Sequence, residues 1–94
     1  MTESEKKKII QESWAAHSIV EQSYLQNSAA KGDSDWLDKQ RVLLADMALH
    51  LLQTALNPGA LEQDKLKNNL FAILTIAEQF LPYTNFSQVK NRIY

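Results

Sequence analysis

The chain has two histidines, and each has a carboxylate four residues away. His17 precedes Glu21, and His50 follows Asp46, so within a helix each pair shares a face and can touch. Imidazole and carboxylate groups bind zinc, and two such pairs on neighbouring helices could supply four ligands. The Glu-x-x-His spacing of di-iron bundles is absent, because tryptophan and methionine occupy the positions three before the histidines.

The surroundings of the two histidines predict different roles for them. His17 falls within an apolar helical face, so we expect it to be buried and hydrogen-bonded to Ser13, to Glu21 or to a backbone carbonyl. Burial beside a carboxylate also makes His17 a candidate pH-sensitive position. His50 falls on a polar stripe with Asp46, which predicts that both face solvent. Because one histidine then faces inward and the other outward, we expect neither a metal site nor a cofactor.

Nucleophilic chemistry has little support in the chain. There is no cysteine, no serine in a strand-turn-helix context, and the two glycines are isolated. The sequence therefore predicts a protein that is not an enzyme.

The segment 42–56 predicts a helix that is apolar over most of its circumference. At about 100° per residue its polar side chains collapse onto one narrow stripe. The stripe consists of Lys39, Asp46, His50, Gln53 and Asn57. The apolar arc is far wider than the roughly 100° that a surface helix needs, so it must be covered by other helices or by another chain.

Apolar periodicity and capping residues predict an all-α fold in a single domain over residues 1–94. We expect a three-helix bundle with helices at about 3–27, 34–56 and 60–81, and a short fourth helix at about 85–93. Thr2 and Glu5 have the spacing of a capping box. The other predicted helix ends involve Asp33 or Ser34, Asn57 before Pro58, Pro82, and Thr84 or Asn85.

Composition narrows the class of protein. The net charge is −1, and arginine occurs only twice, so the clustered basic surface of a nucleic-acid-binding protein is missing. No window is apolar over about 18 residues, and the charged first residues do not resemble a secretory signal. Together with the absence of cysteine, these observations predict a soluble, cytoplasmic protein that contacts neither nucleic acid nor membrane.

The excess apolar surface is the strongest indication of function. It predicts a small protein–protein interaction module, an adaptor, regulator or inhibitor, that acts through a helical surface and forms a homodimer. The expected contact residues are Trp36, Leu43, Leu49, Leu52 and Phe71. The alternative is a ligand- or metal-binding bundle with a pocket around His17, lined by Trp14 and Tyr24.

Overall fold

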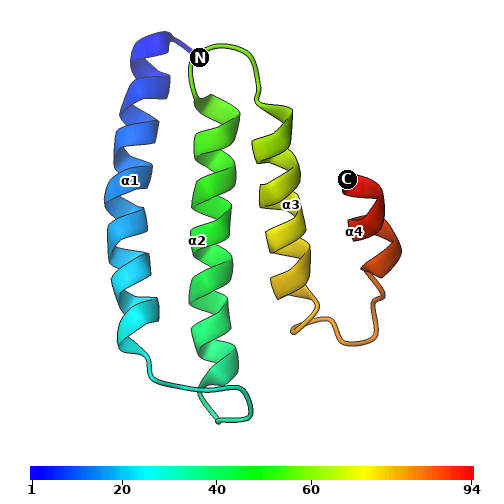
Figure 1. The fold of residues 1–94 in the computed structure, drawn as a ribbon. Helices are drawn as coiled ribbons and strands as arrows, with labels where there is room; N and C mark the ends of the chain where they lie inside the picture. The colour runs from blue at the N-terminus through cyan, green and yellow to red at the C-terminus, as the bar shows by residue number, and fades with distance from the viewer.

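The computed structural model describes residues 1–94 and contains four α-helices. They are α1 (Glu3–Gln26), α2 (Trp36–Leu56), α3 (Gln63–Ala77) and α4 (Ser87–Ile93) (Figure 1). There are no strands. The predicted fold class, three long helices with a short fourth, is confirmed. No helix combines the length and the apolar character that crossing a membrane requires.

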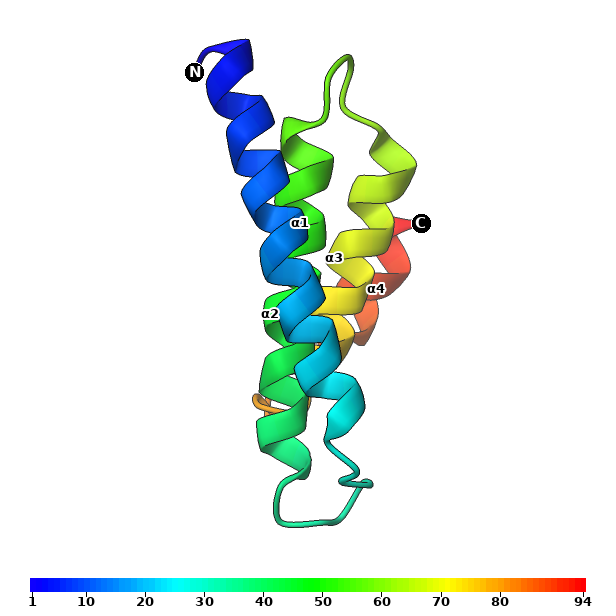
Figure 2. The same ribbon diagram turned by 90° about the vertical axis from the view of Figure 1, so that its left-hand side faces the viewer.

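The three long helices lie side by side in one layer. Figure 1 shows α2 between α1 and α3, with α4 beyond α3. α2 packs against both neighbours, whereas α1 and α3 do not pack against each other. The molecule measures 44 × 33 × 17 Å, and its thinness is visible in the edge-on view of Figure 2. Two sides of the central helix are therefore covered by this chain, and two remain open.

The layer is bent at α2. Asp46 and Gln53 contact α1, Thr54 contacts α3, and Gln40 contacts Gln79 just beyond the end of α3. On a helical projection these two sets lie about 110° apart around α2. The bend gives the layer an inner side, which α1 and α3 flank, and an outer side, on which α2 is most prominent.

The predicted start of α1 is confirmed. The Glu5 N–H donates to Thr2 Oγ1 at 3.1 Å, and the Thr2 N–H donates to Glu5 Oε1 at 2.8 Å, which completes the capping box. α2 begins at Trp36, two residues later than predicted. The Asp33 carboxylate is used inside the preceding turn, where it accepts from the Ala30 N–H at 2.8 Å, so it does not cap the helix.

α3 is shorter at both ends than the predicted range 60–81. Gly59 has a φ of +88° and belongs to the turn before the helix, so Asn57 does not cap α3. At the other end the Phe80 N–H bonds to the Ala77 carbonyl at 3.0 Å, a tightened turn that ends the helix ahead of Pro82. Asn85 Oδ1 accepts from the Ser87 N–H at 3.0 Å at the start of α4.

The interior of the layer is mainly polar. Only seven residues are buried, and Ala29 and Ile76 are the only apolar ones among them. The buried polar residues are Ser13, Gln40, Asp46, Gln53 and Thr54. The prediction that the polar stripe of the second helix faces solvent is therefore wrong for Asp46 and Gln53, because they face α1 and find their hydrogen-bond partners there.

Candidate functional site

Four ionisable side chains meet between α1 and α2, and we call them the His17 cluster: His17 and Glu21 from α1, Asp46 and His50 from α2. His17 Nδ1 contacts Asp46 Oδ1, and His17 Nε2 lies 3.1 Å from Glu21 Oε2. His50 Nε2 lies 3.5 Å from Asp46 Oδ2. The two imidazole rings are 4.8 Å apart between centroids. One carboxylate, that of Asp46, thus links both histidines of the chain.

The cluster is buried at its centre and accessible at its edges. The side chains of His17 and Asp46 are 15% and 11% exposed, whereas those of His50 and Glu21 are 34% and 52% exposed. The ring of Trp14 stands edge-on to that of His17, with centroids 5.5 Å apart. A small ion or a water molecule can therefore approach from the side of His50 without unfolding the chain.

The antiparallel pairing of α1 with α2 sets the register of the cluster. Near one end of the seam Gln53 Nε2 donates to Ser13 Oγ at 3.2 Å, and Ser13 Oγ donates to the Ile10 carbonyl at 2.6 Å. Near the other end the Lys39 ammonium lies 4.8 Å from the centre of the Tyr24 ring. His17 lies between these contacts on α1, so it falls opposite the turn of α2 that carries Asp46 and His50.

The structure corrects the argument against a metal site. The sequence predicted that His17 faces inward and His50 outward, but both rings approach the carboxylate of Asp46. The error has a physical cause: α2 is the middle helix of a layer, so Asp46 and Gln53 of its polar stripe lie against α1 instead of solvent. The pairing of His17 with Glu21 is confirmed, whereas Ser13 bonds elsewhere.

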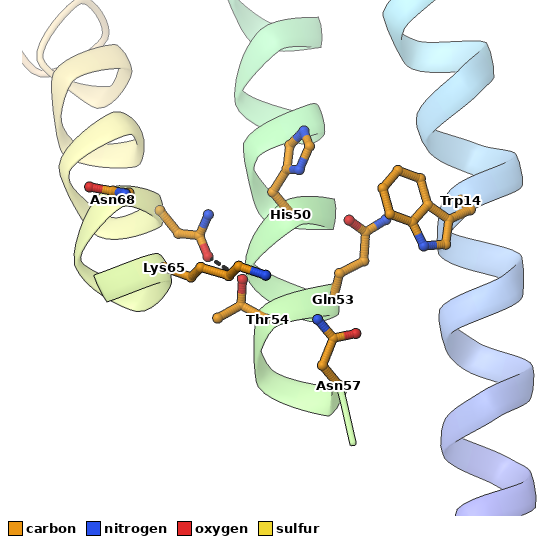
Figure 3. A pocket seen from close by; sticks show the side chains of 8 residues that line it. Trp14, His50, Gln53, Thr54, Asn57, Lys65 and Asn68 are labelled. Carbon is orange, nitrogen blue, oxygen red and sulfur yellow. Dashed lines mark hydrogen bonds between the residues drawn. The ribbon is translucent and has the colours of Figure 1, made fainter. Parts of the chain in front are cut away.

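A groove opens on the inner side of the layer beside His50 (Figure 3). Its cavity volume is about 310 Å³, and Trp14 is its one large apolar side chain. The lining residues come from all three long helices and from Asn57, which follows α2: Trp14, His50, Gln53, Thr54, Asn57, Lys65, Asn68 and Asn69. Of the three residues predicted to surround a pocket, Trp14 lines this groove, whereas His17 and Tyr24 do not.

The seam between α2 and α3 is also polar but less completely bonded. Thr54 Oγ1 donates to Asn69 Oδ1 at 2.6 Å, and Gln79 Nε2 donates to Gln40 Oε1 at 3.2 Å. The second pair leaves Gln40 Nε2 and Gln79 Oε1 buried without a partner. Such groups cost free energy, so the Gln40–Gln79 pair stabilises the structure less than a fully bonded pair would.

The predicted contact residues lie on different sides of the molecule. Trp36, Leu43, Leu49 and Leu52 are all partly exposed on α2. Phe71 on α3 is 36% exposed, and α4 covers part of its ring: Tyr94 packs 5.5 Å away between ring centroids, and the Lys90 ammonium lies 5.4 Å from the ring centre. Part of the surface of Phe71 is thus used within the chain.

Sequence reasoning missed the central position of Asp46. The signal that could have found it is the apolar surroundings of His17, because a buried imidazole needs hydrogen-bond partners on both ring nitrogens. Glu21 can serve only one of them. The polar stripe of the next helix was the nearest source of the second partner.

Comparisons with protein-family models, with curated proteins and with solved structures found no match to this chain.

Proposed function

We propose that this chain is a non-enzymatic protein–protein interaction module that works as a homodimer, with the outer side of one layer packed against that of a second copy. The residues assigned to the contact form a stripe along α2, which we call the outer stripe. It consists of Leu37, Arg41, Ala45, Ala48, Leu52 and Ala55.

The observation that carries the proposal is the size of the exposed surface. The chain exposes 6759 Å², whereas a folded monomer of its mass exposes about 5,500 Å². The excess, roughly 1,250 Å² per chain, matches the share that each partner contributes to an obligate homodimer, whose interface buries about 2,000 Å² or more in total. The radius of gyration of 15.0 Å likewise exceeds the roughly 12.4 Å of a compact chain of this length.

The outer stripe has the spacing of a helix–helix contact. Its members recur every three or four residues, as in the seam of a coiled coil. All of them are exposed except Leu52, which is half-buried, and Arg41 is the only charged one. The three alanines leave room for a partner helix to approach closely. A second copy fits this surface, since an antiparallel pair of stripes is self-complementary around Ala45 and Ala48.

The contact residues predicted on α2 lie on two different sides of that helix. Leu52 belongs to the outer stripe, and Leu49 lies next to it by helical spacing. Trp36 and Leu43 project toward the inner side of the layer, so we assign them no part in the dimer. Substitutions on the two sides of α2 therefore distinguish this dimer from one formed through the inner side of the layer.

The test is the mass of the chain in solution, measured by light scattering during size exclusion. We expect twice the chain mass of 10.7 kDa for the unaltered protein, and a monomer for Ala48→Glu, which places like charges opposite each other across the two-fold axis. Gln22→Glu adds the same charge on the solvent-facing side of α1 and should remain a dimer. A monomer at high micromolar concentration would overturn the proposal, and so would an Ala48→Glu dimer as tight as the unaltered one.

A further inference from the structure

We propose that His17, Asp46 and His50 form a binding site for a divalent transition-metal ion, with Zn²⁺ as the ion to test. This inference is independent of the dimer, because all three ligands come from one chain. It also replaces the metal-free expectation drawn from the sequence, whose premise about the direction of His50 the structure overturns.

The three donor groups are already gathered. One ligand atom from each of His17, Asp46 and His50 lies within 4.8 Å of the other two. In a tetrahedral zinc site with bonds of about 2.0–2.1 Å, ligand atoms lie roughly 3.4 Å apart. The longest separation must shorten from at most 4.8 Å to about 3.4 Å, which His50, as the most exposed of the three side chains, can supply by rotation. The direct contact of His17 Nδ1 with Asp46 Oδ1 must open to admit the ion.

Glu21 gives the site the supporting contact that metal-bound histidines use. A ligating imidazole usually donates its second ring N–H to a carboxylate, which fixes the tautomer and the ring orientation. With its proton on Nε2, His17 donates to Glu21 Oε2 at 3.1 Å, and the unprotonated Nδ1 can hold an ion between itself and Asp46, in place of their direct contact. We therefore assign Glu21 as a positioning residue and not as a ligand.

The local charge favours a cation. The cluster holds two carboxylates, and neither forms an ion pair with a lysine or arginine. Lys65, which lines the adjoining groove, pairs with Glu62 at 3.3 Å. A divalent ion would balance both carboxylates in a partly buried position where they have only imidazole partners.

The direction of approach leaves a coordination position open. His17, Asp46 and His50 are three protein ligands, and His50 borders the groove of Figure 3. A fourth ligand, water or an anionic group of a bound molecule, can enter from there. Because the chain has no other histidine and no cysteine, any imidazole that binds zinc must belong to this site.

The experiment titrates the metal-stripped full-length chain with Zn²⁺ in a calorimeter. We expect one ion per chain, with affinity at least about 100-fold weaker in His50→Gln and in Asp46→Asn. Glu21→Gln should weaken binding about 10–100-fold, as loss of a supporting carboxylate does. Glu12→Gln, a carboxylate removed elsewhere on α1, should leave the affinity unchanged. Helical circular dichroism of every variant separates a lost ligand from a lost fold.

X-ray absorption at the zinc edge supplies the second readout, with two imidazole ligands expected in the unaltered chain and one in His50→Gln. Absence of binding at millimolar Zn²⁺ would overturn the proposal. Full affinity in both His50→Gln and Asp46→Asn, or a bound zinc without imidazole, would do the same. The mass measurement of the Ala48→Glu variant tests the dimer separately, so either proposal can fail alone.

Discussion

The α1–α2 seam and the outer stripe of α2 lie on two sides of the same helix and have opposite characters. In the seam the buried side chains are polar, and Asp46 and Gln53 bond to named partners on α1. Along the outer stripe every side chain except that of Arg41 is apolar or small, and all but the half-buried Leu52 are exposed. Hydrogen bonds demand particular partners, whereas apolar surface accepts any complementary one. The seam thus fixes how α1 and α2 pair within the chain. The outer stripe is apolar surface whose burial can stabilise association with a second copy.

The largest effect is expected from Asp46→Ala in the seam. The change removes the carboxylate that both histidines contact and leaves Nδ1 of a largely buried His17 without a partner. We expect a loss of about 2–3 kcal/mol in the free energy of unfolding, measured by urea denaturation at fixed protein concentration. Glu21→Ala should cost under about 1 kcal/mol, because that carboxylate is half exposed. Equal losses in the two variants would show that the seam is not organised around Asp46.

Leu52→Ala in the outer stripe should act on association and little on folding. Leu52 is only half-buried within its own chain, so the isolated chain loses few contacts. Its burial against a second copy predicts at least about a tenfold weaker dimer. Sedimentation equilibrium over a range of concentrations measures this constant. Leu43→Ala, the matched truncation on the inner side of α2, should leave the constant unchanged; a tenfold weakening there would move the interface to the inner side of the layer.

Gln53→Ala tests whether contacts outside the His17 cluster also stabilise the α1–α2 seam. The substitution removes the hydrogen bond to Ser13, whose own donation to the Ile10 carbonyl remains. We expect a loss of about 1 kcal/mol in unfolding free energy. Gln22→Ala, the same truncation on the solvent side of α1, should be neutral. If Gln53→Ala costs as much as Asp46→Ala, the seam acts as one network.

The sequence predicted the helices well and their arrangement poorly. Apolar periodicity, Thr2 with Glu5, and Pro82 are local signals, and each acts within a few residues of the boundary that it sets. Which side of α2 meets another helix depends instead on how many helices lie next to it. The pattern of α2 allows either a closed bundle or an open layer, because its apolar arc is wide enough for both.

The sequence did not predict that the two histidine–carboxylate pairs meet, and the reason is the same. The two i, i+4 pairs, His17 with Glu21 and Asp46 with His50, were recognised from their spacing. Their convergence depends on the antiparallel register of α1 and α2. That register is set by contacts about 40 residues apart in the chain, such as Gln53 with Ser13, and no local pattern reports it.

The smallest effect is expected at the exposed capping box, which lies outside both regions. Hydrogen bonds from the Thr2 backbone and then from its side chain hold the pKa of Glu5 below its ordinary value. A lowered carboxyl pKa in the folded state stabilises the helix end above the ordinary pKa, and this stabilisation is lost as the pH falls through the lowered value. Thr2→Ala keeps the backbone N–H and removes only the hydroxyl, so the pKa of Glu5 should rise only part of the way toward its ordinary value. Amide exchange in the first turn should be about fivefold faster, the size of a typical cap. Carboxyl titration and amide exchange by NMR measure both.

Exchange in the α1–α2 seam should be unaltered, since fraying at Glu3 to Glu5 stops well short of Ser13. Faster exchange at Ser13 would mean that the seam depends on the helix end and not on its own polar contacts.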